Sequence, residues 1–288
     1  MEIFHKIHLV DVDLMSAILN HSADTCTVYK TVDGQPLYLG IYYPKGYDRT
    51  GSYPTFIFIH GGSWCEKKVF DDQPFWHGDY LGFLARYYAD KGFVCVSIDY
   101  RLIREQGQAE NYGLIDSYED CCDAIDFIQS RAGNYGIDTK RMYLLGESAG
   151  GHLAGAIATF HYDRHYNFET VFLVNPITSL HDSKWKTRVP HKSNHNSLCN
   201  LTLHDRVEFL SPLYQADVHT SRVILLHGNA DTCVSLEHSK AFYTKMLTLG
   251  KECNLHILDG VNHAFLLAEF TTELDACKLG ISIINEYF

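Results

Sequence analysis

The chain has 288 residues, 46% hydrophobic and 20% charged, a balance that excludes a disordered protein. Its formal net charge of -11 disfavours nucleic acid and anionic membranes as partners, because both are polyanions and no Lys/Arg-rich block offsets the repulsion. No run of about 18 apolar residues predicts a membrane-spanning helix. We expect one domain over 1–288, since α/β domains often exceed the usual length of about 150 residues. The oligomeric state stays open.

Cysteine usage and the amino-terminal stretch favour the cytoplasm. The chain has 9 cysteines, an odd number, with no CxxC pair, which is typical of free thiols in a reducing compartment. The stretch "MEIFHKIHLVDVDLMSAIL" carries acidic residues and shows no small-residue cleavage site, so it does not resemble a signal peptide. We therefore expect a cytoplasmic protein, unless a signal peptide has been removed.

Short β-branched or aromatic runs alternate with longer helical patterns along the chain. This alternation predicts an α/β fold with a mostly parallel central sheet flanked by helices. Strands are expected at 27–32, 37–44, 55–59, 93–99, 141–146, 170–175, 222–228 and 254–259, and helices at 78–91, 116–132, 149–160, 235–249 and 269–286. Asp33-Gly34 predicts a hairpin between the first two strands.

One segment breaks this rhythm. Residues 178–209 are polar and rich in His, Asn and Ser. Such a composition predicts a small loop-rich insertion or cap.

The stretch "LLGESAGGHLAG" places Ser148 between an apolar strand and a helical pattern. A sharp strand-to-helix turn needs small neighbours, which Gly146, Ala149 and Gly150 supply, and it leaves the serine hydroxyl exposed. The unpaired N–H groups at the start of the helix then point toward whatever the hydroxyl attacks. Ser148 is therefore the predicted nucleophile.

A second motif, "FIFIHGGSW", follows another apolar strand. Ester hydrolysis passes through a tetrahedral oxyanion, which fixed N–H donors stabilise, and glycines allow the backbone to approach closely. The predicted oxyanion donors are the backbone N–H groups of Gly62, Ser63 and Ala149.

The motifs "HGGSW" and "GESAGG", with "DYRL" between them, resemble α/β-hydrolase carboxylesterases related to the hormone-sensitive-lipase group. The resemblance runs from about Leu37 to the end of the chain. Ser63 replaces the third glycine common in that group, which strains the local geometry but keeps the backbone donor.

This resemblance implies a Ser, acid, His order along the chain, with the acid and the base after successive strands. "RVILLHGNADTCV" supplies Asp231 and "NLHILDGVNHAF" supplies His263. His263 would take the proton of Ser148, and Asp231 would fix the imidazole tautomer. Asp259 is the rival acid, although its position only four residues before His263 favours a turn. The chemistry requires no cofactor.

Four further residues are candidate substrate contacts: Gly61, Trp64, Glu147 and Trp185. The side chain of Glu147 is expected to point away from Ser148 and to hold a neighbouring loop. The tryptophans Trp64, Trp76 and Trp185, with Phe75, could form a sugar-stacking rim.

Other polar residues receive structural interpretations. Arg101 is expected in an ion pair rather than on the substrate. His161 and His165 have the spacing of a zinc pair but lack the glutamate of a metalloprotease helix, so no metal site is predicted. His191 and His195 are expected on the surface.

The layout of the insertion, followed by a Ser-Pro-Leu motif, resembles bacterial acetylxylan and related carbohydrate esterases. It implies hydrolysis of acetyl or other short acyl esters on a small molecule or oligosaccharide. An arylformamidase-like amide hydrolase is the alternative on the same fold, and a binding module that has lost catalysis is a third. Labelling by a fluorophosphonate would separate the enzymes from the binding module.

Overall fold

A computed structural model describes residues 12–66, 81–103, 112–160, 164–189, 200–266 and 274–288. Its central element is a sheet of eight strands with the order β1-β2-β4-β3-β5-β6-β7-β8. The strands are β1 Thr25–Val32, β2 Gln35–Tyr42, β3 Tyr53–Ile59, β4 Val94–Ile98, β5 Ile137–Glu147, β6 Thr170–Val174, β7 Val223–Gly228 and β8 Cys253–Leu258. Each of the eight overlaps an expected strand, so the predicted mostly parallel sheet is confirmed, with bounds that differ by up to four residues.

Strand direction divides the sheet into two parts. Among the described strands, β1 pairs antiparallel with β2 and β2 with β4, whereas the pairs from β4 to β8 are parallel. The hairpin between β1 and β2 turns at Asp33 and Gly34, whose φ angles of 49° and 79° are those of a tight primed turn. The parallel strands place their carboxyl ends at one edge of the sheet, where ligand sites of α/β folds form.

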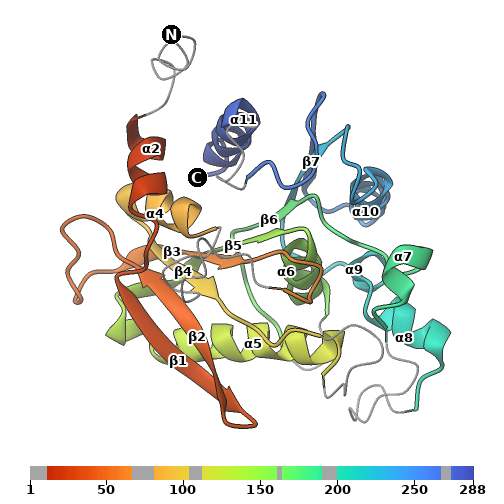
Figure 1. The fold of residues 1–288 in the computed structure, drawn as a ribbon, viewed down its shortest axis with the longest axis horizontal. Helices are drawn as coiled ribbons and strands as arrows, with labels where there is room; N and C mark the ends of the chain where they lie inside the picture. The colour runs from red at the N-terminus through yellow and green to blue at the C-terminus, as the bar shows by residue number, and fades with distance from the viewer. Residues whose placement is uncertain (1–11, 67–80, 104–111, 161–163, 190–199, 267–273) are drawn as a thin grey trace.

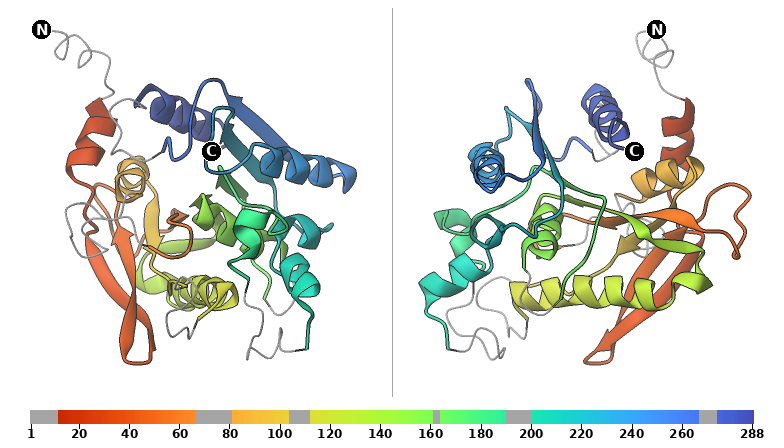
Figure 2. Two further views of the ribbon diagram at one scale, coloured as in Figure 1. Left: turned by 45° about the vertical axis from the view of Figure 1, so that its right-hand side comes forward. Right: turned by 180° about the vertical axis from the view of Figure 1, so that it is seen from behind.

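Helices cover both faces of the sheet (Figure 1). They are α2 Val12–Leu19, α4 Gly82–Asp90, α5 Leu114–Ser130, α6 Ala149–Thr159, α10 Glu237–Thr248 and α11 Leu274–Asn285, with shorter turns α7 Ser183–Lys186, α8 Leu203–Phe209, α9 Pro212–Gln215 and η1 Ala132–Asn134. Buried residues of α5, α6 and α10 join one hydrophobic cluster, and those of α2, α4 and α11 join the other. Figure 2 shows the sheet and its covering helices after a turn of 45° and from behind.

Alternation along the strands explains these two cores. In β3, Ile57 and Ile59 belong to the cluster with α5 and α6, whereas Phe56 and Phe58 belong to the cluster with α4 and α11. Successive side chains of a strand point to opposite faces, so a sheet buried on both sides needs an uninterrupted apolar run. The sequence "TFIFI" meets that need.

One expectation about helices requires correction, and one is made more specific. The short helix α2 lies in an amino-terminal stretch where no helix was expected. The insertion at 178–209 is not only loop, because α7 and α8 lie within it, and Thr202 and Asp205 form a capping box that begins α8. Among the described helices, none is long and apolar enough to cross a bilayer.

Candidate active site

Ser148 occupies the corner between β5 and α6. Its φ and ψ angles of 54° and -115° lie outside the usual regions for a residue with a side chain, and its N–H donates to the carbonyl of Val174 at 2.8 Å. A Cβ on Gly146 would lie 2.1 Å from the carbonyl oxygen of Gly150, and one on Gly150 would lie 2.0 Å from that of Ile59. Only glycine fits on either side of the turn, as the sequence motif predicts.

The structure brings the three predicted triad residues together. Oγ of Ser148 lies 2.9 Å from Nε2 of His263, and Nδ1 of His263 lies 2.6 Å from Oδ2 of Asp231. Ser148 follows β5, Asp231 follows β7 and His263 follows β8, so the contacts form at the carboxyl edge of the parallel strands. This arrangement can pass a proton from the hydroxyl to the imidazole while the carboxylate holds the ring.

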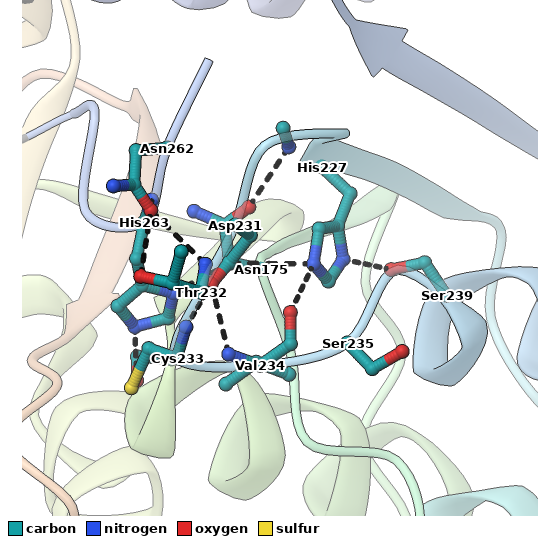
Figure 3. A network of polar contacts seen from close by, with 12 residues as sticks. Asn175, His227, Asp231, Thr232, Cys233, Val234, Ser235, Ser239, Asn262 and His263 are labelled. Carbon is teal, nitrogen blue, oxygen red and sulfur yellow. Dashed lines mark hydrogen bonds and ion pairs between the residues drawn. The ribbon is translucent and has the colours of Figure 1, made fainter. Parts of the chain in front are cut away.

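The loop of Asp231 is organised by its own backbone and by a second histidine (Figure 3). Oδ1 of Asp231 accepts the N–H groups of Cys233 and Val234 at 2.7 and 2.8 Å. Nε2 of His227 lies 3.3 Å from Oδ2 of Asp231. Burial alone would raise the pKa of Asp231, but hydrogen bonds from His227, His263 and Val234 hold it well below its usual range. The carboxylate is therefore ionised.

His227 is a functional neighbour that the sequence analysis did not identify. It is fully buried at the end of β7, where Nδ1 lies 2.8 Å from Oγ of Ser239 and Nε2 lies 3.0 Å from the carbonyl of Val234. The carbonyl is an acceptor only, so Nε2 carries the hydrogen and Nδ1 accepts from Ser239. His227 thus ties the acid loop to α10.

Asp259 takes no part in the contacts of His263. Its carboxylate accepts the Asn229 side-chain amide at 2.8 Å, and the amide oxygen of Asn229 accepts the N–H of Gly260 at 2.8 Å. These bonds close the turn after β8, as expected from its spacing.

The loop after β3 places Gly62 and Ser63 beside the serine corner. Gly62 has a φ of 110° and Ser63 one of 53°, so the motif bends through the left-handed region. Within the described part of the chain, the N–H groups of Gly62, Ser63 and Ala149 form no hydrogen bond. Tyr100 supports the loop by donating its hydroxyl to the carbonyl of His60 at 2.9 Å. The predicted oxyanion donors are therefore open to a ligand.

The expectation that Glu147 points away from Ser148 is wrong. Its Oε1 lies 3.7 Å from Nε2 of His263, the nitrogen that contacts Ser148. Its other oxygen packs against the oxyanion loop, where a Cβ on Gly61 would lie 2.3 Å from it. Burial raises the pKa of Glu147 to about 7, against the charge of His263, which lowers it. Sequence reasoning missed this contact because the sharp turn after β5 sets the direction of the side chain that ends the strand.

The predicted tryptophan rim is also wrong for the two tryptophans that can be described. Trp64 is 0% exposed and Trp185 is 3% exposed, and their rings meet edge to face at 5.7 Å. Both belong to the core cluster on the α6 side, because burying a large aromatic side chain removes a large apolar area from water. Phe75 and Trp76 lie outside the described residues, as do His161, His191 and His195.

A cleft of about 1110 Å³ opens beside the oxyanion loop. Its lining is mixed, with Gln35, Pro36, Leu37, Gly62, Ser63, Cys65, Glu66, Tyr100, Arg101, Leu102, Ile103, Tyr112 and Arg188. Arg101 is held in ion pairs with Asp120 and Asp116 at 2.6 and 3.2 Å, which confirms its predicted ion pairing. The cleft offers hydroxyl, amide and charged groups next to Ser63.

Comparisons with known proteins agree with this geometry. The profile of the BD-FAE family matches residues 39–246. A probable isoprenylcysteine alpha-carbonyl methylesterase of Oryza sativa is 25% identical over 263 residues, covering 80% of this chain and 55% of that protein. A probable dipeptidyl-aminopeptidase B of Penicillium rubens is 25% identical over 250 residues, covering 83% of this chain and 26% of that protein. The chain thus spans about half or less of the length of these relatives.

Solved structures share the fold. The native esterase Est2 of Thermogutta terrifontis superposes with a TM-score of 0.73 at 23% identity, covering 93% of this chain and 92% of that one. The same esterase with butyrate bound gives a TM-score of 0.70 at 24% identity, covering 92% and 95%. These likenesses establish the α/β-hydrolase fold.

Proposed function

The chain belongs to the BD-FAE family, and from this premise we propose that it is a serine carboxylesterase acting on short acyl esters, in particular acetyl esters of carbohydrates. The observation that carries the proposal is the continuous set of contacts from Ser148 through His263 to Asp231. The esterases among the related proteins and structures support the same reaction class.

The first half-reaction follows from these contacts. Nε2 of His263 takes the proton of Ser148 as Oγ attacks the ester carbonyl carbon. The carbonyl oxygen becomes the oxyanion and accepts hydrogen bonds from the N–H groups of Gly62, Ser63 and Ala149. The imidazolium then returns its proton to the leaving alkoxide, which departs as the alcohol and leaves an acyl group on Ser148.

The second half-reaction repeats these roles with water. His263 removes a proton from a water molecule as its oxygen attacks the acyl carbon. Collapse of the tetrahedral intermediate releases the carboxylic acid, and the proton on His263 returns to Oγ of Ser148. Asp231 stays ionised throughout, because three hydrogen bonds hold its pKa low.

The acyl length is inferred from the cleft and from a relative. Long chains require a groove in which each buried methylene contributes about 0.8 kcal/mol, whereas this cleft is lined by many polar groups, including Gln35, Tyr112 and Arg188. The Thermogutta esterase has been solved with propionate and with butyrate bound, which supports a short acyl group for this chain. Because Trp64 and Trp185 are buried, they do not support a sugar substrate. The support for a carbohydrate ester is the polar lining of the cleft.

The test is a panel of substrates measured with the wild-type chain and Ser148→Ala. We expect kcat/KM to fall steeply from acetyl to butyryl to octanoyl nitrophenyl esters, and acetate to be released from acetylated xylo-oligosaccharides. Formyl-kynurenine should be a poor substrate. Equal activity on octanoyl esters, with no acetate released from any acetylated sugar, would overturn the substrate proposal while leaving the reaction class intact. A folded wild-type chain that no fluorophosphonate labels would overturn the reaction class itself.

A further inference from the structure

We propose that His181, His204 and Glu208 form a binding site for a divalent transition-metal ion of the zinc type. The three ligand atoms, one from each side chain, all lie within 4.8 Å of one another. Nε2 of His181 lies 3.6 Å from Oε1 of Glu208, and Nε2 of His204 lies 3.5 Å from the same oxygen. The site shares no residue with the contacts around Ser148, so it does not depend on the proposed esterase function.

The distances exceed those of hydrogen bonds and fit the spacing of ligands around an ion. Hydrogen-bonded nitrogen and oxygen atoms lie about 2.7–3.2 Å apart. Two ligands that each lie about 2.0–2.1 Å from a tetrahedral zinc ion are separated by roughly 3.4 Å. Both contacts of Glu208 fall close to that value. Within the described part of the chain, the carboxylate of Glu208 and the two imidazole rings have no hydrogen-bonding partner.

Local structure brings two of the ligands onto one helical face. His204 and Glu208 are four residues apart on α8, and that spacing stacks side chains one turn above another. The capping box fixes where the helix begins, since the N–H of Asp205 donates to Oγ1 of Thr202 at 3.2 Å.

The third ligand comes from the segment after β6. The N–H of His181 donates to Oγ of Ser179 at 3.3 Å, and the N–H of Leu180 donates to Oγ of Ser211 at 2.8 Å. The His181 ring packs edge to face on Tyr214, with centroids 5.2 Å apart. These contacts direct the imidazole toward α8. The site therefore joins a segment from the sheet edge to the helical part of the insertion.

The donor set selects the class of ion. Imidazole nitrogens and one carboxylate oxygen suit zinc and its neighbours in the first transition row, whereas calcium and magnesium prefer oxygen ligands alone. Three protein ligands leave a fourth position for water. The side chains of His181, His204 and Glu208 are 31%, 67% and 42% exposed, so an ion can enter directly from solvent. A bound ion would stabilise the insertion by linking its two halves.

The experiment measures Zn²⁺ binding to the full chain after treatment with EDTA and removal of the chelator. We expect one ion per wild-type chain by calorimetric titration under reducing conditions. His204→Ala and Glu208→Gln should each weaken the affinity at least tenfold, following the loss of one ligand. His165→Ala, which removes an exposed histidine outside the cluster, is the matched control and should bind as the wild type does.

A thermal measurement provides an independent check. Zn²⁺ at about one hundred times the wild-type Kd should raise the Tm of the wild type by roughly 5 °C, and should raise the Tm of His204→Ala by about half as much or less. Absence of binding to the wild type would overturn the proposal. Binding of equal affinity to His204→Ala and Glu208→Gln would overturn it too, because the ion would then lie elsewhere, for example on a free cysteine.

Discussion

Glu147 and His263 face each other across the serine corner, with Oε1 of the glutamate 3.7 Å from Nε2 of the imidazole. Burial alone would lower the pKa of His263, but the hydrogen bond of Asp231 and the charges of Glu147 and Asp231 outweigh it and raise that pKa. A general base must be neutral, so activity is lost as the pH falls through this raised pKa. The acid limb should therefore lie above the ordinary value of 6.5.

Glu147→Gln should move the acid limb to lower pH. The amide carries no charge to stabilise the imidazolium, so the pKa of His263 falls. The measurement is kcat/KM against pH, with Glu169→Gln as the control, since Glu169 is exposed at the amino end of β6. If the acid limb of kcat/KM stays unchanged or moves to higher pH, the Glu147 charge does not stabilise the His263 imidazolium.

Ser148→Ala and His263→Ala should each lower kcat by a factor on the order of 10⁴ or more, because a triad acts as a unit. Circular dichroism should show an intact fold for both variants. Near-normal turnover in folded Ser148→Ala would remove the serine from the mechanism.

Substitution by asparagine distinguishes the roles of the two aspartates near His263 in sequence or in space. Asp231→Asn should lower kcat by on the order of 10³ to 10⁴, because the imidazole loses the carboxylate that orients it. Asp259→Asn should change kcat by less than about tenfold, since in the described part of the chain the Asp259 carboxylate bonds to Asn229 within its turn and not to His263. If Asp259→Asn lowered kcat more than Asp231→Asn did, Asp259 would be the acid of the triad.

Removal of His227 should affect both stability and turnover. His227→Ala leaves Ser239 and the Val234 carbonyl without their partner in a buried site, at a cost of about 2–3 kcal/mol in the free energy of unfolding. Turnover should fall because the Asp231 loop loses its support. His227→Gln keeps a donor and an acceptor and should recover part of both losses. Urea unfolding and kcat, measured on the same samples, test this; equal losses in both variants would count against a hydrogen-bonding role.

Gly150→Ala should destabilise the fold by more than about 2 kcal/mol, because its Cβ would meet the carbonyl oxygen of Ile59 at 2.0 Å. Gly133→Ala is the control, since a Cβ there meets nothing within 4 Å, and its effect should stay within about 0.5 kcal/mol. Urea unfolding measures both. A stable Gly150→Ala variant would mean that the turn can open.

The sequence was sufficient wherever neighbours along the chain determine the structure. The eight strands and the turn at Ser148 follow from short patterns with local causes, whereas the assignment of Asp231 and His263 came from the chain order that the family resemblance implies. Contacts between segments that are distant in the sequence could not be predicted from such patterns. The burial of Trp185 depends on Trp64, which precedes it by more than a hundred residues, and His227 looks like any other residue at a strand end until Ser239 and Asp231 are placed around it.

The contact of Ser148 with His263 joins positions separated by 115 residues, and β6, β7 and β8 must be in order before it can form. Contacts of long sequence separation close late during folding, because the entropy of a long loop opposes them. Hydrolysis of a chromogenic ester during refolding therefore reports the docking of β8, whereas far-ultraviolet dichroism reports earlier helix formation. A lag between the two signals would measure how slowly the last third of the sheet assembles.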